Sequence, residues 1–209
     1  MSNINIGRMV VGPVQTNCYY VLNEDTKEAV VVDPADQGQR IYEEITKRGM
    51  NIKGILLTHG HFDHVMGLDA LRKAAGVKAY IGEGDVALIE SADLNVSHMF
   101  GQPFSTKADE AVKDGQILEL AGMKIKVIGT PGHTAGGESD YFEEAGIVIS
   151  GDTLFSESVG RTDFPTSSSA QLRQSITEKL FALPDEVYVY PGNGPVTTIE
   201  HEKANNLFV

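Results

Sequence analysis

The stretch "THGHFDH" at residues 58–64 concentrates side chains that bind metal ions. It holds three of the six histidines of the chain and one aspartate. Side chains two positions apart in extended backbone point the same way, so His59 and His61 can face one ion. Gly60 between them has no side chain, and we expect its backbone to approach the metal closely. The spacing therefore predicts one wall of a metal site.

Asp63 and His64 complete this motif at the turn into the next predicted helix, from which they can reach a second position nearby. Imidazole and carboxylate ligands together suit Zn, Fe or Mn better than Ca or Mg. The alternative interpretation is a set of exposed polar loop residues. Because the motif directly follows the apolar run at residues 52–57, we favour metal binding over that alternative.

Later stretches offer ligands from elsewhere in the chain. His133 in "TPGHT" and Asp152 in "SGDT" each follow a predicted strand, and pockets of α/β proteins lie where strands end. Each also has a structural interpretation, since Pro-Gly-His-Thr is typical of a turn and Asp152 can cap a helix or a turn. They become candidates because the first motif needs further ligands. His98 and His201 lack such neighbours and are interpreted as surface residues.

The elements that must position these residues alternate between strands and helices. Strands are predicted by β-branched and aromatic runs bounded by turn formers, and helices by apolar residues at helical spacing. The expected strands are 17–22, 28–34, 52–58, 77–82 and 186–192, with hairpins over 116–133 and 139–152 that turn at 121–122 and 144–145. The expected helices are 38–49, 65–76, a short one over 85–91 and one that starts at a serine cap within 167–184. This alternation predicts a layered α/β protein.

Composition limits the function. The chain has 209 residues, of which 41% are apolar, and a formal net charge of −12. So acidic a chain is a poor nucleic-acid binder, because binding requires cations that neutralise phosphates. No signal peptide or membrane-spanning run is expected, and Cys18 is the single cysteine, which suits a reducing cytoplasm. No linker-like segment divides the chain, so we expect one domain over residues 1–209.

The order H-x-H-x-D-H, then P-G-H-T, then S-G-D-T resembles the metallo-β-lactamase superfamily. The segments "GPVQTNCYYV", "VVDP", "GDTLF", "SVGRTDFP" and "YPGNGPVTT" are most similar to glyoxalase II-type hydrolases. The resemblance implies a four-layer αββα sandwich with a two-metal site at one edge. It implies one or two zinc ions, with iron or manganese as alternatives. The implied ligands are His59, His61 and His133 for one metal, Asp63 and His64 for the other, and Asp152 as the bridge.

Asn193 departs from the family pattern. Family members usually place a final histidine there, in a P-G-H-G-P stretch, as a ligand of the second metal. An amide oxygen is a much weaker ligand than imidazole. We therefore predict a second metal site that is weaker, partly occupied or lost.

The resemblance implies hydrolysis of a small-molecule acyl-thiol, such as an S-hydroxyacylglutathione. A bound metal lowers the pKa of water from ~15.7 toward ~7, and Asp63 would orient the resulting hydroxide. Arg161 can bind a substrate carboxylate by bidentate pairing, or it can form a structural ion pair with Asp163. Glyoxalase II enzymes add a C-terminal helical domain that contacts glutathione. Few residues follow "YPGNGP" here, so we expect the short single-domain type, with the thiol and the oligomeric state left open.

Two other functions stay open. A mononuclear iron dioxygenase acting on a persulfide would use His59, His133 and Asp152 as a facial triad. A catalytically impaired metal-binding variant is suggested by Asn193. A nucleic-acid-processing relative is excluded by the length and the acidic charge.

The stretch "GGESDYF" is a second departure, because related proteins tend to carry small or apolar residues there. Glu138 and Asp140 share one face of the predicted strand. We interpret this face as solvated, with an acidic contact near the metals as the alternative.

Overall fold

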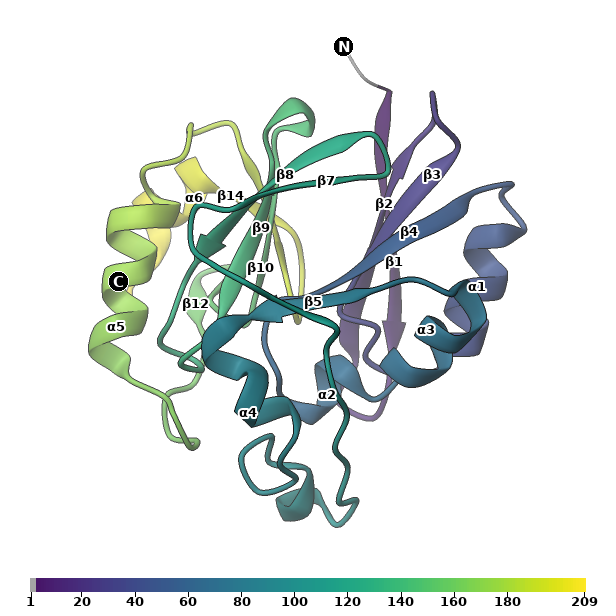
Figure 1. The fold of residues 1–209 in the computed structure, drawn as a ribbon. Coiled ribbons are helices and arrows are strands. Elements are labelled where there is room, and N and C mark those ends of the chain that lie inside the picture. Colours follow the sequence, from purple (N-terminus) through teal and green to yellow (C-terminus); the bar gives the residue numbers. More distant parts are fainter. Residues whose placement is uncertain (1–2) are drawn as a thin grey trace.

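Two six-stranded sheets face each other in the computed structural model, which describes residues 3–209, and helices cover the outer face of each sheet (Figure 1). The first sheet consists, in spatial order, of β1 (Ile4–Val11), β2 (Thr16–Asn23), β3 (Glu28–Val32), β4 (Asn51–Leu57), β5 (Ala79–Gly82) and β6 (Glu110–Val112). The second consists of β14 (Thr197–Thr198), β13 (Tyr188–Pro191), β10 (Ile147–Gly151), β9 (Glu138–Phe142), β8 (Met123–Gly129) and β7 (Ile117–Leu120). A small hairpin pairs β11 (Leu154–Phe155) with β12 (Ser158–Val159).

The helices lie on both sides of this pair of sheets. They are α1 (Gly38–Thr46), α2 (Phe62–Val65), α3 (Leu68–Ala75), α4 (Val86–Ile89), α5 (Ser169–Gln174) and α6 (Ile199–Asn205). The helix α5 continues as a π-helical segment over Ser175–Leu180. Within residues 3–209, no helix has the length and apolar character that crossing a membrane requires.

Alternation along β2 shows how the layers are held together. All eight residues of this strand are buried. Cys18 and Tyr20 belong to the core beneath α1 and α3, whereas Tyr19 and Val21 belong to the core between the two sheets. Successive side chains of a strand point to opposite faces, so a strand that is buried on both faces has a nearly continuous run of apolar residues. The four-layer αββα sandwich expected from the sequence is thereby confirmed.

The outer cores come from amphipathic helices. Ile41 and Ile45, four residues apart on α1, pack in the same cluster as Leu68 of α3. On the opposite side, Leu172 and Ile176 pack with strands of the second sheet. The predicted serine cap is Ser168, whose side chain accepts a hydrogen bond from the Gln171 backbone N–H. Both predicted hairpin turns are present, at 121–122 and at 143–145.

Two parts of the element prediction were wrong or incomplete. The helix expected over 65–76 is divided at Gly67, whose N–H donates to the Pro34 carbonyl oxygen at 2.8 Å. A Cβ at position 67 would lie 2.4 Å from that oxygen, so glycine permits the contact and the chain turns there. The sequence reading also missed β1, β6, the β11–β12 hairpin, β14 and α6, most of which are short or lie at an edge.

Every candidate ligand follows the carboxyl end of a strand. The strands β3, β4 and β5 are parallel to one another. In the second sheet, β8 and β10 run in the same direction because both are antiparallel to β9, and β13 is parallel to β10. The loops after these strands therefore meet at one edge of the sandwich, where ligand sites of open α/β sheets form.

The solvated face expected for Glu138 and Asp140 is wrong. Both side chains are buried, with 2% and 0% exposure, and none of their four carboxyl oxygens has a hydrogen-bond partner. β9 pairs along both edges, with β8 and β10, and all five of its residues are buried, so both of its faces are covered as well. Burial raises the pKa of both carboxyls well above the usual range; repulsion from Asp140 adds to the effect at Glu138, and repulsion from Asp33 adds to it at Asp140.

Replacing this pair by E138Q/D140N is expected to change the pH dependence of stability. The folded state keeps protons that the unfolded state releases above about pH 4, so the free energy of unfolding of the wild type falls as pH rises. The amides do not titrate and avoid this loss. The Tm of the double variant minus that of the wild type should grow by about 3 °C or more between pH 5 and pH 8, measured by thermal unfolding. E119Q, at an exposed position on β7, is the control. A difference in Tm that stays constant with pH would contradict the raised pKa values.

Candidate metal centre

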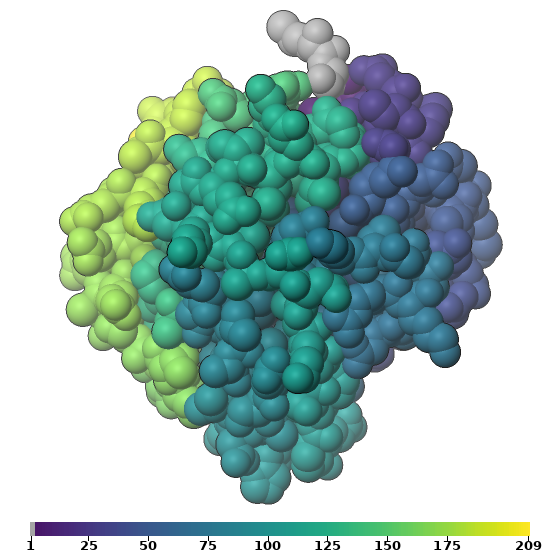
Figure 2. Space-filling model, viewed as in Figure 1, coloured from purple at the N-terminus to yellow at the C-terminus, as the bar shows by residue number. Residues whose placement is uncertain are grey.

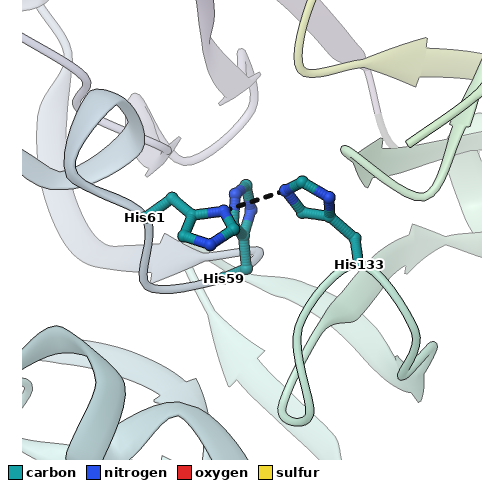
Figure 3. A group of neighbouring side chains, drawn as sticks. All are labelled: His59, His61 and His133. Atoms are coloured by element: carbon teal, nitrogen blue, oxygen red, sulfur yellow. Dashed lines mark hydrogen bonds between the residues drawn. The ribbon is translucent and has the colours of Figure 1, made fainter. Parts of the chain in front are cut away.

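Three histidines from two distant loops converge at the edge of the sandwich (Figure 3). His59 and His61 lie in the loop after β4, and His133 lies in the loop after β8. One ring nitrogen from each lies within 4.8 Å of the others, and all three side chains are buried. The Nδ1 atom of His61 is 2.9 Å from the Nε2 atom of His133. Two ring nitrogens so close need a proton or a cation between them.

Hydrogen bonding determines which nitrogen of His59 is free. The Thr58 hydroxyl donates its single proton to Asp33 Oδ2 at 2.7 Å, since a carboxylate only accepts. The same hydroxyl lies 3.1 Å from His59 Nδ1 and must accept from that nitrogen. Nδ1 of His59 therefore carries the proton, and Nε2 presents a lone pair. That Nε2 is buried and has no hydrogen-bond partner.

The same arrangement recurs at two further rings. His64 Nδ1 donates to Asp33 Oδ2 at 2.8 Å, and His133 Nδ1 donates to the Arg161 carbonyl oxygen at 2.8 Å. In each case the opposite nitrogen, Nε2, is left to face the centre. A hydrogen bond to the far nitrogen is the usual way in which proteins orient a histidine that binds a metal.

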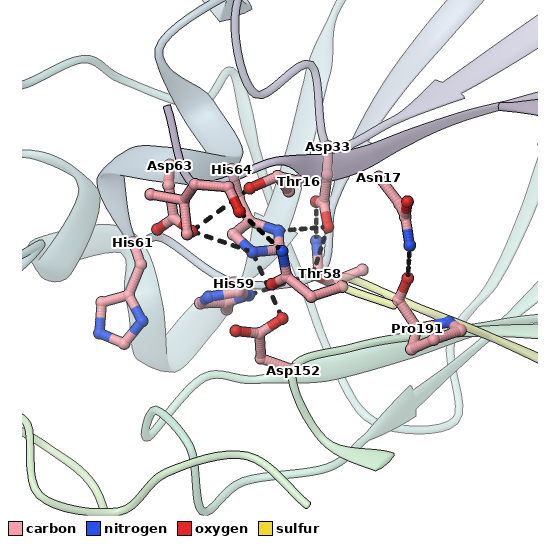
Figure 4. A network of polar contacts seen from close by, with 12 residues as sticks. Thr16, Asn17, Asp33, Thr58, His59, His61, Asp63, His64, Asp152 and Pro191 are labelled. Atoms are coloured by element: carbon pink, nitrogen blue, oxygen red, sulfur yellow. Dashed lines mark hydrogen bonds and ion pairs between the residues drawn. The ribbon is translucent and has the colours of Figure 1, made fainter. Parts of the chain in front are cut away.

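Asp152 lies next to His64, to which a dashed line joins it in Figure 4, and close to His133. Its Oδ2 is 3.6 Å from His133 Nε2, and its Oδ1 is 3.4 Å from His64 Nε2. Asp63 Oδ2 is 3.7 Å from the same nitrogen of His64 and accepts a long hydrogen bond, 3.4 Å, from the Thr16 hydroxyl. Each oxygen of Asp152 thus faces a different histidine.

The charges of these groups suit a cation. Burial, with repulsion from the neighbouring histidines, lowers the pKa of His59 well below its usual value and that of His61 to about 3, so both rings are neutral near pH 7. Burial alone would lower the pKa of His64, but Asp152, Asp33 and Asp63 outweigh it and raise the pKa. Burial alone would likewise raise the pKa of Asp152, but His64 and the other histidines lower it to about 2.

The residues present fit a metal ion. His59 Nε2, His64 Nε2 and Asp152 Oδ1 are buried near the centre without a hydrogen-bond partner, and His61 turns its Nδ1 toward His133. Buried polar atoms without partners are rare because each costs about 1–3 kcal/mol. Nitrogen and carboxylate ligands that converge in this way form a metal site of histidine and aspartate residues.

Asp33 and Asp85 belong to the site and were missed as site residues. Asp33 accepts from Thr58 N, the Thr58 hydroxyl and His64 Nδ1, so it orients rings on both sides of the centre. The signal for Asp33 was present, since "VVDP" places a carboxylate at the end of a buried strand. No local pattern distinguishes Asp85, because its partners lie 25 to 51 positions away.

Asp85 connects the two loops that carry the histidines. Its Oδ2 accepts from the Gly60 N–H at 2.9 Å and the Thr134 hydroxyl at 2.7 Å, and its Oδ1 accepts from the Gly136 N–H at 2.7 Å. Burial raises the pKa of Asp85, and these three hydrogen bonds oppose the shift. Gly60 has a further role that the sequence did not suggest. A Cβ there would lie 2.8 Å from Leu88 Cδ2, so this glycine permits close packing on α4 and the bond to Asp85.

Asn193 lies in the loop after β13, beside the candidate ligand Asp152, and contacts the loop between β1 and β2. Its amide Nδ2 donates to the carbonyl oxygens of Val14 and Gln15, both at 3.3 Å. The preceding Gly192 abuts the centre, since a Cβ there would lie 2.3 Å from Asp152 Oδ1. Position 193 is thus adjacent to the ligands, and its side chain ties down the β1–β2 loop.

The remaining sequence candidates lie at the surface or at the rim. Arg161 is exposed, and its guanidinium group forms two hydrogen bonds to Asp163, at 2.6 and 2.7 Å. The structural ion pair considered from the sequence is therefore present. His98 and His201 are exposed and pair with carboxylates away from the centre, as interpreted.

A pocket of about 350 Å³ opens beside the histidines. Its polar lining consists of His61, Asp63, His133, Asp152, Ser158, Arg161 and Asn193. Its apolar lining consists of Val14, Phe62, Val96, Phe100, Phe155, Val159 and Phe164. The pocket gives a small molecule access to the side of the centre on which Asp63 and Asp152 lie.

Known proteins are similar to this chain in sequence. The sequence profile of the metallo-beta-lactamase superfamily matches residues 11–192. YqgX of Bacillus subtilis, described as a probable metallo-hydrolase, is 36% identical over 204 residues, covering 97% of this chain and 96% of that protein. The hydroxyacylglutathione hydrolase GloC of Haemophilus influenzae is 35% identical over 213 residues, covering 99% and 98%.

Two solved structures extend the likeness to three dimensions. The BLEG-1 B3 metallo-beta-lactamase superposes with a TM-score of 0.93 at 34% identity, covering 98% of this chain and 99% of that one. TTHA1623 in a di-iron-bound form superposes with a TM-score of 0.87 at 34% identity, covering 97% and 100%. With its αββα sandwich and its centre of histidine and aspartate side chains, the chain belongs to the metallo-β-lactamase superfamily.

Proposed function

We propose that this protein is a metal-dependent hydrolase that cleaves thioesters of small acyl-thiols. The observation that carries the proposal is the convergence of unpartnered histidine nitrogens and one aspartate oxygen beside an open pocket. The likeness to YqgX supports hydrolysis, and the likeness to GloC supports a thioester as the substrate. We include a cytoplasmic location in the proposal, in keeping with the single, buried cysteine.

The ligands would divide as the resemblance implies: His59, His61 and His133 for one ion, Asp63 and His64 for another, and Asp152 between them. A bound metal supplies a water of lowered pKa and polarises a carbonyl group. Asp63 faces the pocket and can accept a hydrogen bond from the attacking water, which aligns it with the carbonyl carbon. A thiolate is a good leaving group, so the chain needs no strong general acid.

Zinc is the metal that we propose, and iron is the main alternative. Imidazole and carboxylate ligands suit both ions. TTHA1623 carries two irons in its structure at 34% identity to this chain. Elemental analysis of the protein purified without added metal would identify the ion and its stoichiometry.

Hydrolysis of S-D-lactoylglutathione and other acyl-thiols, followed by release of free thiol, tests the proposal. Activity should disappear after chelation by EDTA and return on addition of zinc. If the protein holds about one iron per chain and consumes oxygen when a persulfide is added, the dioxygenase is the correct function and the hydrolase proposal is wrong. Faster turnover of a β-lactam than of every thioester would show that the substrate class is wrong.

Replacing Asn193 by histidine is expected to strengthen the second metal site. Imidazole is a far better ligand than an amide oxygen, and position 193 lines the pocket with Asp152 and directly follows Gly192, which abuts Asp152 and His64. Mutating a residue that only orients a metal ligand typically costs about 10–100-fold in metal affinity. Adding a ligand should have at least a comparable effect, so we expect affinity for the second ion to rise about tenfold or more. Competitive chelator titration measures the affinity. Asn193→Ala controls for loss of the contact with the β1–β2 loop. Unchanged metal content and rate in Asn193→His would disprove the predicted weakness.

A further inference from the structure

The pocket beside the histidines has a mainly apolar wall. Seven of its fourteen lining residues are phenylalanine or valine. Phe100, at the mouth, is 54% exposed. Its ring packs on the buried ring of Phe62, with 4.8 Å between the centroids and 35° between the planes. An exposed aromatic ring at the mouth of a pocket gives a bound molecule apolar contact area.

The loop that carries Phe100 is fixed to the metal-binding motif. It belongs to the segment between α4 and β6 that projects below the sheets (Figures 1 and 2). Buried Asn95 holds it, because its Nδ2 donates to the Phe104 carbonyl oxygen at 2.8 Å and its own carbonyl oxygen accepts from the Phe62 N–H at 3.1 Å. Val96 adopts a φ of +60°, which a β-branched residue rarely takes. This loop is therefore held against α2, the helix that carries Asp63.

The charges in the pocket do not suit an acyl-glutathione. Such a molecule brings two carboxylates and one ammonium group, and proteins usually bind carboxylates with unpaired arginine or lysine. Arg161 is the one cationic side chain in the lining, and both of its hydrogen bonds go to Asp163 while its guanidinium lies 3.9 Å from the centroid of the Phe164 ring. Asp63 and Asp152 add negative charge to the same lining.

We propose that the substrate is a thioester of an aromatic or branched aliphatic acid with an uncharged thiol, rather than an acyl-glutathione. The proposal rests on the proposed thioester hydrolysis and specifies its substrate. The apolar wall takes the acyl group, with Phe100 and Phe62 against it. The absence of an unpaired cation in this lining disfavours the carboxylates of glutathione.

Four probes separate the contributions of acyl group and thiol. They are the phenylacetyl and the D-lactoyl thioesters of N-acetylcysteamine and of glutathione, assayed with the zinc-loaded protein. We expect kcat/KM to be at least tenfold higher for phenylacetyl-N-acetylcysteamine than for lactoylglutathione, with both changes contributing. Equal values for the four, or the highest value for lactoylglutathione, would overturn this proposal and leave thioester hydrolysis intact. No hydrolysis of any probe would remove the proposed function itself.

Phe100→Ala tests the apolar wall directly. The variant should lose about tenfold in kcat/KM for the phenylacetyl thioesters and much less for the lactoyl thioesters, because only the phenylacetyl group is large and apolar enough to pack against the apolar wall. Met99→Ala is the matched control, since Met99 is 69% exposed on the same segment and does not line the pocket. An equal loss on all four probes in Phe100→Ala would indicate a structural effect and overturn the assignment of the wall.

Discussion

Replacing His133 with alanine is expected to lower thioester hydrolysis by about a thousandfold. The ring of His133 faces both His61 and Asp152, so its loss removes a candidate metal ligand from between these two residues. A metal contributes several kcal/mol to stabilising a transition state, and each 1.36 kcal/mol is a factor of ten in rate. Metal content by elemental analysis should fall together with kcat/KM.

His98→Ala is the matched control for this prediction. His98 is exposed and pairs only with Asp93, away from the centre. The control should retain wild-type metal content and rate. Thermal unfolding in the presence of EDTA separates loss of metal from loss of fold, because the chelated forms of wild type and His133→Ala should then differ little. Full metal content in His133→Ala would exclude this residue as a ligand.

Asp85→Asn is expected to weaken metal binding 10–100-fold although the residue does not face the centre. The carboxylate accepts three hydrogen bonds, from Gly60, Thr134 and Gly136. An asparagine has one acceptor oxygen, so its NH₂ group must face at least one of these donors. A buried donor left unsatisfied costs about 1–3 kcal/mol. The loop with His59 and the loop with His133 should then separate.

Two measurements distinguish this positioning role from a general loss of stability. Chelator competition gives the metal affinity, and urea unfolding of the metal-free protein gives its stability. We expect the free energy of unfolding of the metal-free protein to fall by about 1–3 kcal/mol. The loss of metal affinity should be larger than the increase in unfolded protein can explain. Asp93→Asn, at an exposed carboxylate, should change neither quantity. Loss of stability with unchanged affinity in Asp85→Asn would refute the positioning role.

The dense local motif made the candidate centre predictable. His59, His61, Asp63 and His64 lie within six positions, where backbone geometry alone limits how far their side chains can separate. The apolar and aromatic run of β2 and the helical spacing of apolar residues on α1 likewise predicted a strand and a helix, and the alternation of such elements predicted layers. His133 and Asp152 became candidates only because the first motif needs further ligands, since a histidine or aspartate in a turn has common structural uses, and the resemblance then implied their roles.

The environment of Glu138 and Asp140 could not be read from the sequence. Strand periodicity shows that two residues share a face but not whether that face is covered. Burial was decided by the opposing sheet, whose strands lie far away in the sequence: Phe142, on the same face of β9, packs in the core between the two sheets. Charged residues are normally solvated, and this chain departs from that rule at Glu138 and Asp140.

The sequence by itself determined which residue types could bind a metal and which elements would carry them, because both depend on short-range spacing. Only the tertiary structure decided which nitrogen of each ring is free. That choice depends on partners such as Asp33 and the Arg161 carbonyl, which lie 31 and 28 positions from the histidines they bind and are brought close as each half of the chain folds. The packing of the two sheets placed Asp85 between the loops and the apolar wall beside the histidines.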